Sequence, residues 1–184
     1  MDPVTLADIK LYNFVKSDSR DSEITQFLPT AIKKVEDYTG RALIDQEFDI
    51  WYDAEEFKQM MGNNFAYLST LNVTSIESIS SFSIDGTETI IDDTTYRLQN
   101  NQAKFDVTIP SGSTRAQDAY KISVRAGYGA DDTEVPATLK TAIAYMIKHY
   151  LSFKGNVSTE PTNHIPNMVK EFMTPYTSTM KWFN

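Results

Sequence analysis

Apolar residues recur along the chain with two different periods, and the changes of period divide the sequence into three stretches. Between Ile24 and Tyr38 they repeat at the three- and four-residue spacing of an amphipathic helix. From Gln46 to about Tyr128 apolar and polar residues alternate, which predicts short strands. After Pro136 the helical spacing returns. The expected order of elements is therefore helices, a strand-rich insertion and then helices.

The most regular helix is predicted just before a glycine. Its apolar stripe consists of Ile24, Phe27, Leu28, Ala31, Ile32, Val35 and Tyr38. Asp21 or Ser22 is expected to cap its start, because short polar side chains accept hydrogen bonds from the first backbone N–H groups. Pro29 predicts a kink or a restart, since it removes one backbone hydrogen bond. Gly40 is suited to the left-handed conformation that ends a helix.

Three other helices are predicted on either side of the strand-rich stretch. The first covers about Leu6–Val15, with Thr5 as N-cap and Asp8 completing a capping box. A long one of about five turns begins near Pro136, whose missing N–H costs nothing in the first turn. A short one follows from about Pro166 to Met173.

The alternating stretch predicts a small antiparallel β subdomain, folded as a sandwich or an open barrel. Asp85-Gly86 is a hairpin signal within it. Its strands are expected at Phe48–Tyr52, Val73–Ile84, Thr87–Ile91, Tyr96–Leu98, Phe105–Ile109 and Tyr120–Ala126. The fold class is therefore α+β: a bundle of two N-terminal helices and the long C-terminal helix, with an inserted β subdomain. Residues 1–44 and 130–184 are expected to form the helical domain, and residues 45–129 the insertion.

Composition restricts the possible partners. The 184-residue chain has a net charge of −8, which opposes any function that depends on neutralising phosphates. It contains no cysteine, so disulfides, thiolate nucleophiles and cysteine-based zinc sites are excluded. No charged start precedes an apolar core near Met1, and no apolar run approaches the length of a membrane span. We therefore expect neither export nor membrane insertion.

The sequence offers no catalytic constellation. The two histidines, His149 and His164, do not fall in a metal-binding spacing. The acidic pairs Asp92-Asp93 and Asp131-Asp132 lie where turns favour aspartate. The Gly127–Gly129 stretch lacks the pattern of a phosphate loop. No catalytic residue, cofactor or metal is predicted, and a small hydrolase remains only as a remote alternative.

Three separated motifs together resemble one known family. They are VEDYTGRALI (Val35–Ile44), VRAGYG (Val124–Gly129) with VPATLK (Val135–Lys140), and the closing stretch from Ile165-Pro166 to Pro175-Tyr176. In this order the motifs are similar to the head-tail connector (adaptor, or head-completion) proteins of tailed bacteriophages, in the longer version that carries a β insertion. The resemblance covers about residues 4 to 177.

This resemblance implies a non-enzymatic protein without cofactors. Family members form a homo-oligomeric ring, typically of twelve copies, which binds beneath the portal protein after DNA packaging. The ring extends the DNA channel and presents a platform for a downstream tail protein: a tail terminator, a stopper or a nozzle. The expected location is the head–tail interface of the virion, after assembly in the host cytoplasm. An acidic chain suits a channel through which DNA slides without being gripped.

Interface residues are expected on the helical domain and the C-terminal tail. The candidates for portal or subunit contacts are Arg41, Lys148, Tyr176, Met180, Trp182 and Phe183. The aromatic pair Trp182-Phe183 either folds back on its own core or docks on another chain, since exposed aromatics commonly anchor interfaces. Arg41 either bridges subunits or caps the carbonyl end of its own helix.

An alternative function places recognition in the β subdomain. A tail component could bind a glycan or a host protein through an aromatic platform of Trp51, Tyr52, Tyr67 and Tyr96. For Trp51 at least, packing in the β core is the favoured interpretation.

Overall fold

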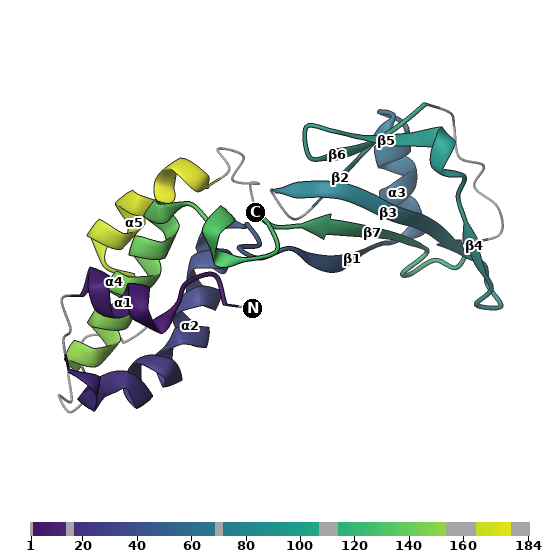
Figure 1. Ribbon diagram of the computed structural model, residues 1–184. Coiled ribbons are helices and arrows are strands. Elements are labelled where there is room, and N and C mark those ends of the chain that lie inside the picture. The colour runs from purple at the N-terminus through teal and green to yellow at the C-terminus, as the bar shows by residue number, and fades with distance from the viewer. Residues whose placement is uncertain (1, 14–16, 69–71, 107–113, 154–164, 178–184) are drawn as a thin grey trace. The chain divides into compact units, whose positions relative to one another are not determined.

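A computed structural model describes residues 2–13, 17–68, 72–106, 114–153 and 165–177. The chain divides into two compact units (Figure 1). The helical unit comprises Met1–Ile44 with Tyr128–Asn184, and the β unit is Asp45–Gly127. Helices build the first unit and antiparallel sheets most of the second, so the α+β class predicted from the sequence is confirmed. No helix in the described ranges is long and apolar enough to cross a membrane.

The helical unit is built around α2 and α4. Its elements are α1 (Leu6–Tyr12), η1 (Asp18–Arg20), α2 (Asp21–Thr39), η3 (Asp132–Glu134), α4 (Ala137–Phe153), α5 (Asn167–Met173) and η4 (Thr174–Tyr176). The predicted stripe of α2 is its buried side, and the core it enters contains Ile24, Leu28, Ala31, Val35, Leu139, Ala142, Ile143, Met146, Ile147, Val169 and Met173. Burying one such Leu, Ile, Val or Met side chain stabilises the fold by about 1.5–3 kcal/mol.

The helix ends follow the sequence signals only in part. The Thr5/Asp8 capping box at α1 is confirmed, with the Asp8 backbone N–H donating to Thr5 Oγ1 over 3.1 Å. Pro29 lies inside one continuous helix, so the predicted restart is wrong. Neither Asp21 nor Ser22 caps α2, because Arg20 occupies the N-cap position and supplies no side-chain cap hydrogen bond. The 3₁₀ turn η1 leads directly into α2 instead.

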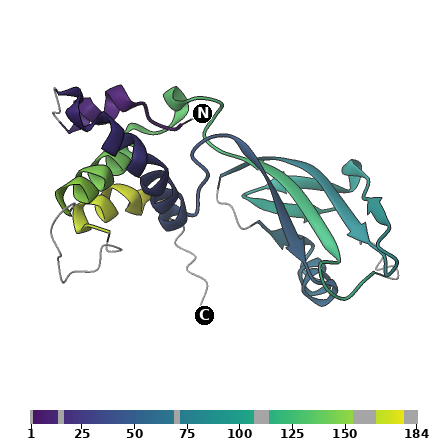
Figure 2. The same ribbon diagram turned by 90° about the horizontal axis from the view of Figure 1, so that it is seen from below.

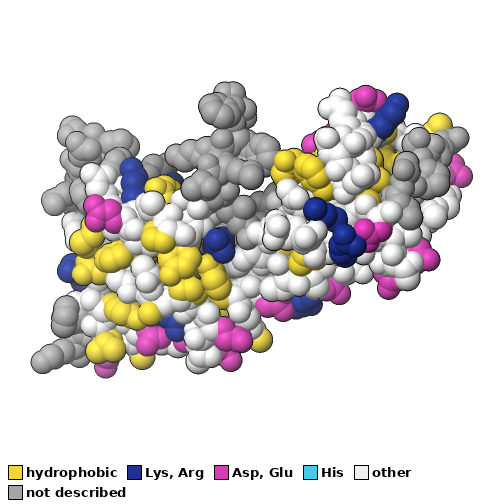
Figure 3. Space-filling view, turned by 90° about the horizontal axis from the view of Figure 1, so that it is seen from above, with side chains coloured by type: hydrophobic (Ala, Val, Ile, Leu, Met, Phe, Trp, Pro, Cys, Tyr) yellow, Lys and Arg dark blue, Asp and Glu magenta, His cyan; other side chains and the backbone are white. Residues whose placement is uncertain are grey.

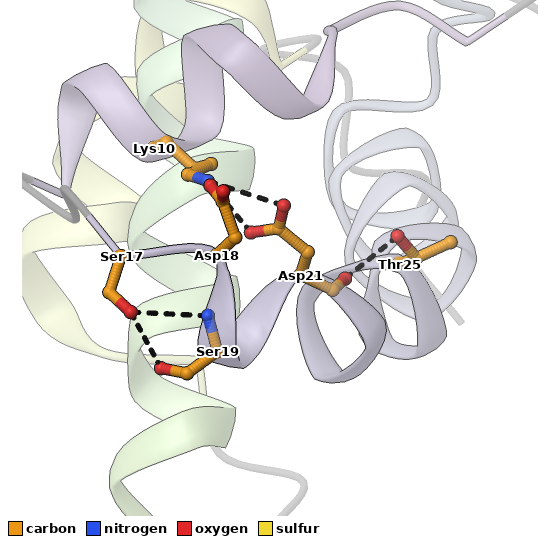
Figure 4. Close-up of polar contacts among 6 residues, drawn as sticks. All are labelled: Lys10, Ser17, Asp18, Ser19, Asp21 and Thr25. Carbon is orange, nitrogen blue, oxygen red and sulfur yellow. Dashed lines mark hydrogen bonds and ion pairs between the residues drawn. The ribbon is translucent and has the colours of Figure 1, made fainter.

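A charged cluster joins α1 to the start of α2 (Figure 4). The Lys10 ammonium lies 2.9 Å from Asp21 Oδ1 and also pairs with the Asp18 carboxylate. Ser17 caps η1, since its Oγ accepts a hydrogen bond from the Ser19 backbone N–H over 3.2 Å. The Lys10 side chain of α1 thus holds both the η1 turn, through Asp18, and the start of α2, through Asp21.

Two antiparallel sheets, one α-helix and one 3₁₀ turn make up the described β unit. Its elements are β1 (Gln46–Tyr52), α3 (Ala54–Met61), β2 (Phe65–Tyr67), β3 (Val73–Phe82), β4 (Glu88–Ile90), η2 (Asp93–Thr95), β5 (Tyr96–Gln99), β6 (Gln102–Phe105) and β7 (Tyr120–Ala126). The strand orders are β1-β7-β3-β4 and β2-β6-β5. The sequence did not predict α3 or β2. The strand expected at Phe105–Ile109 begins earlier, at Gln102, and residues 107–109 lie outside the described ranges.

Helix α3 packs on one side of the four-stranded sheet at the end where β1 stops and β7 starts, and it lies beside β2 of the smaller sheet (Figures 1 and 2). Phe57 of α3 stacks on Tyr120 of β7 with ring centroids 3.9 Å apart. It also meets the edge of Phe105, at 5.6 Å, and a tilted Tyr52 ring at 6.0 Å. This aromatic cluster forms part of the core of the β unit and defines which side of the sheet is buried.

Candidate assembly interface

The end of α2 forms a tightly hydrogen-bonded turn. Gly40 has φ +66° and donates its backbone N–H to the Glu36 carbonyl over 2.7 Å, as predicted for a helix-ending glycine. The Glu36 carboxylate accepts the Leu43 N–H over 3.0 Å, and Thr39 Oγ1 accepts the Arg41 N–H over 3.3 Å. These bonds fix the backbone from which the Arg41 side chain departs.

Arg41 connects this turn to the last described segment of the chain. Its Nε donates to the Tyr176 carbonyl over 2.7 Å, and Tyr176 itself packs partly buried against the helical core. Arg41 is thus held by η4 rather than by carbonyls of its own helix, so the prediction that it caps that helix is wrong. A role between subunits stays a prediction.

Tyr128 brings the second sequence motif to the same place. Its backbone N–H donates to the Leu43 carbonyl over 3.3 Å. Burial raises the pKa of the Tyr128 hydroxyl, and the nearby positive charge of Arg41 offsets part of that rise. The three motifs that carry the family resemblance therefore meet in space, through Arg41 and Leu43, Tyr128, and Tyr176.

The remaining predicted interface residues are not part of this junction. Lys148 is exposed on α4, with Nζ 5.6 Å from the centroid of the Tyr145 ring, and that ring lies 5.9 Å from Phe172 of α5. Within the described ranges, no hydrogen bond, ion pair or ring contact joins Lys148 to Arg41 or Tyr176. Met180, Trp182 and Phe183 lie outside those ranges.

Hydrophobic side chains surround the helical core without being fully buried. The face drawn in Figure 3 has such side chains gathered over the helical unit. Those that pack against the core while remaining partly exposed are Leu6, Phe27, Ile32, Tyr38, Ile44, Tyr128, Tyr145, Tyr150, Phe172 and Tyr176. Aromatic residues of this kind, half in a core and half at the surface, are suited to contacts with another chain.

The aromatic platform of the alternative function does not form on the β unit. Tyr52 and Tyr96 are buried in the core, and Tyr67 is half-buried. Trp51 lies on the other side of β1 and is 41% exposed, so the interpretation that it packs in the core is wrong. The reason is the alternation of a strand, which points Trp51 and Tyr52 to opposite sides.

The sequence did not predict which residues lie beside Trp51. Its ring centroid lies 5.2 Å from that of Phe82, and the Arg115 guanidinium and Lys121 ammonium lie over both rings. These residues come from β3, β7 and the segment before β7. The only available signal, alternation in each strand, gives the side of the sheet but not the register between strands.

The first aspartate of each acidic pair behaves as a turn residue. Hydrogen bonds from Thr94, first its backbone N–H, lower the pKa of Asp92, and those from Thr133, first its hydroxyl, lower the pKa of Asp131. Each aspartate caps a 3₁₀ turn, as predicted. No group of three or more His, Asp or Glu side chains in the described ranges is arranged to hold a metal ion.

The fold, a helical unit carrying an inserted β unit, is similar to that of proteins in the particles of gene transfer agents. A chain in the "neck of empty GTA particle computed with C6 symmetry" matches with a TM-score of 0.73 at 17% identity, covering 99% of this chain and 93% of that chain. One from the "virion of native gene transfer agent (GTA) particle" matches at 0.71 and 16%, covering 99% and 93%. One from the "neck of native GTA particle computed with C12 symmetry" matches at 0.69 and 17%, covering 98% and 94%.

A family assignment comes from the sequence itself. The chain belongs to the head completion protein family, whose match extends over residues 4–176 and so includes both units. No curated protein is significantly similar to the chain in sequence. Membership confirms the resemblance noted above on three motifs, and it assigns the chain to a structural class of virion proteins.

Proposed function

We propose that the chain is a head–tail adaptor of a tailed bacteriophage. Copies of it form a ring beneath the portal protein, extend the DNA channel and provide the platform to which the next tail component attaches. The observation that carries the proposal is the head completion family match over residues 4–176, which spans both the helical frame and the insertion. It is a structural function at the head–tail interface of the virion, without catalysis.

A ring is supported by the symmetry of the similar structures. Two matching chains come from particle necks computed with C6 and C12 symmetry. The partly exposed aromatic residues around the helical core are suited to contacts between neighbours in such a ring. A copy number of twelve agrees with both symmetries, since a twelvefold ring also obeys sixfold symmetry.

The expected partners follow from the same arrangement. The portal protein lies on one side of the ring and a terminator, stopper or nozzle protein on the other, and no membrane is involved. DNA passes through the lumen without sequence-specific binding, which the net charge of −8 favours. We propose that Arg41, Lys148, Tyr176, Met180, Trp182 and Phe183 contribute to subunit or portal contacts.

Reconstitution tests this function. The purified protein is mixed with the portal of its own phage, and the products are analysed by electron microscopy and by native mass measurement. A ring bound to the portal at fixed stoichiometry is expected. Absence of any complex over a wide range of salt and protein concentrations contradicts the proposal.

A further inference from the structure

Strand β1 is at one edge of the four-stranded sheet, in the order β1-β7-β3-β4. All seven of its residues pair with β7 on one side, in an unbroken register. In the described ranges, no backbone hydrogen bond joins residues 46–52 to any other segment. The strand contains neither proline nor lysine, the residues that commonly protect a sheet edge from another chain. This free edge of β1 can therefore accept a further strand.

The side of β1 that faces away from α3 is acidic. Glu47 and Asp49 point to this side, as Trp51 does, and both are exposed. The two cations on the same side of β7, Lys121 and Arg125, form their ion pairs with carboxylates outside β1. Within the described ranges, no ion pair reaches Glu47 or Asp49. A strand added to the free edge would therefore be favoured if it carried a cation on this side.

The other side of β1 is apolar and incompletely covered. Phe48 and Ile50 point to this side and are only half-buried. Tyr52, at the end of the strand, is buried, because its ring lies 6.0 Å from that of Phe57 in α3. A strand with apolar side chains on this side would cover Phe48 and Ile50 further.

The last seven residues of the chain have the complementary pattern. Residues 178–184, which lie outside the described ranges, read Ser-Thr-Met-Lys-Trp-Phe-Asn and contain neither glycine nor proline. In an extended conformation, Lys181 would point to one side, and Met180 and Trp182 to the other. The tail thus offers one cation on one side and two large apolar side chains on the other, at the spacing of a strand.

Its length also matches that of β1, since both have seven residues. In a parallel register that sets Lys181 beside Asp49, every residue of the tail lies along β1. The same register brings Phe183 to the side and the position of Trp51, where two aromatic rings can pack together. The two apolar residues on the other side of the tail then lie along the half-buried pair of β1.

We infer that residues 178–184 of one copy pair as a parallel strand with the free edge of β1 in the next copy of the ring. The inference rests on the proposed ring, and it gives the C-terminal tail a defined acceptor. A closed ring of identical chains needs a head-to-tail interface in which two different surfaces meet, and a tail and a sheet edge are two such surfaces. In strand addition, backbone hydrogen bonds supply affinity and the alternating side chains supply specificity.

Site-specific cross-linking tests this contact. Because the chain has no cysteine, single cysteines can be introduced without background from the chain itself. One preparation carries Gln46→Cys, at the exposed first residue of β1, and a second, distinguishable in mass, carries Ser178→Cys or Asn184→Cys. The two are co-assembled on the portal and treated with a short bis-maleimide reagent. Cross-links between positions 46 and 178 of different chains are expected in the assembled fraction.

Substitution tests the energetic contribution. Trp182→Ala is expected to raise the concentration for half-maximal ring assembly at least about tenfold, as for loss of an interface hot spot. Lys181→Glu should raise it about fivefold, because an exposed ion pair contributes less. Adding Asp49→Lys to Lys181→Glu exchanges the two charges and should recover most of that loss. Arg97→Glu, on the exposed surface of the other sheet, is the control and should leave assembly unchanged. Circular dichroism confirms that each variant is folded.

The outcomes separate the inference from the function. Rings in which position 46 cross-links to neither tail position, or only to position 184, overturn the inference and leave the proposed function intact. So does a tail that cross-links to the portal alone, or full assembly by folded Trp182→Ala and Lys181→Glu. A copy with cysteines at both 46 and 178, diluted among cysteine-free copies, detects pairing within one chain, and that product also overturns the inference. Failure of the wild-type chain to assemble with its portal contradicts the proposed function itself, and the inference falls with it.

Discussion

At the residue scale, Gly129 lies where the side chain of Glu134 occupies the space that a Cβ would need. A Cβ there would be 1.7 Å from Glu134 Oε2 and 2.8 Å from Glu134 Cβ. The carboxylate is held in place because it accepts the Ala130 N–H over 2.9 Å. The second glycine of the Gly127–Gly129 stretch thus serves this close approach and not a phosphate.

Gly129→Ala is therefore expected to displace the exposed Glu134 side chain and to destabilise the helical unit by up to about 1 kcal/mol, chiefly through loss of the hydrogen bond from the Ala130 N–H. The double variant Gly129→Ala/Glu134→Ala should cost clearly less than the sum of the two single variants, since the carboxylate no longer competes for the space. Urea unfolding followed by circular dichroism measures all three. If the free-energy changes of the two single variants simply add in the double variant, the contact with Glu134 is not the reason for glycine at position 129.

At the element scale, the docking of α1 depends on the charges around Lys10. Hydrogen bonding to Lys10 lowers the pKa of the exposed Asp18 carboxyl, and the same pair raises the pKa of Lys10. For a carboxyl with a lowered pKa, the stabilisation is present above its unfolded-state value and is lost as the pH falls through the folded-state value. Lys10 has the opposite dependence at alkaline pH: the stabilisation is lost as the pH rises through its raised pKa.

We expect the amide protons of α1 to exchange faster relative to α4 as the pH falls below about 4, the ordinary aspartate value, toward the lowered pKa of Asp18. Hydrogen exchange at a series of pH values measures this, after correction for the intrinsic rate. Asp18→Asn should weaken the dependence in the acidic range, and added salt should reduce it as well, because Asp18 is exposed. If Asp18→Asn shows the same dependence of α1 exchange on pH as the wild type, a carboxyl other than Asp18 is responsible for it.

The η4 segment depends on Arg41 in a similar way. Removing the guanidinium leaves the Tyr176 carbonyl without its 2.7 Å donor. Arg41→Ala is expected to raise hydrogen-exchange rates in residues 174–177 about tenfold, as for loss of one charge-assisted bond. Lys148→Ala, which removes an exposed cation of the same unit, is the control and should leave this segment unchanged. Equal protection in both variants would show that packing of Tyr176 alone holds η4.

Some helices and strands could be predicted from the sequence and others could not. The α2 stripe and the left-handed Gly40 were readable because both depend on residues close in sequence. Helix α3 was missed because only one of its eight residues, Phe57, is fully buried, which leaves no periodic stripe. Trp51 could not be placed beside Phe82, since the register between β1, β7 and β3 depends on partners distant in sequence. The contact of Arg41 with Tyr176 could not be predicted for the same reason, because the two residues are distant in sequence.

At the scale of the whole molecule, two connections join the units, and at each unit the chain ends lie close together. Gln46 pairs with Ala126 at the base of the β unit, and the Tyr128 N–H donates to the Leu43 carbonyl in the helical unit. Each unit also has its own buried core. A domain with these properties tolerates excision, because its termini are neighbours and its core is separate.

We therefore expect both pieces to fold: residues 45–127 alone, and a helical protein in which a short Gly-Ser linker joins Ile44 to Tyr128. A β piece of this size should be only marginally stable, by roughly 3–5 kcal/mol. Circular dichroism and the dispersion of amide NMR signals measure the folding of each piece. As the control, the amide signals of each piece are compared with those of the same residues in the intact chain, and they should match. If either piece is unfolded while the intact chain is folded, the cores depend on each other. If both fold, the helical protein alone can be tested for portal binding, which shows whether the portal contacts need the β unit.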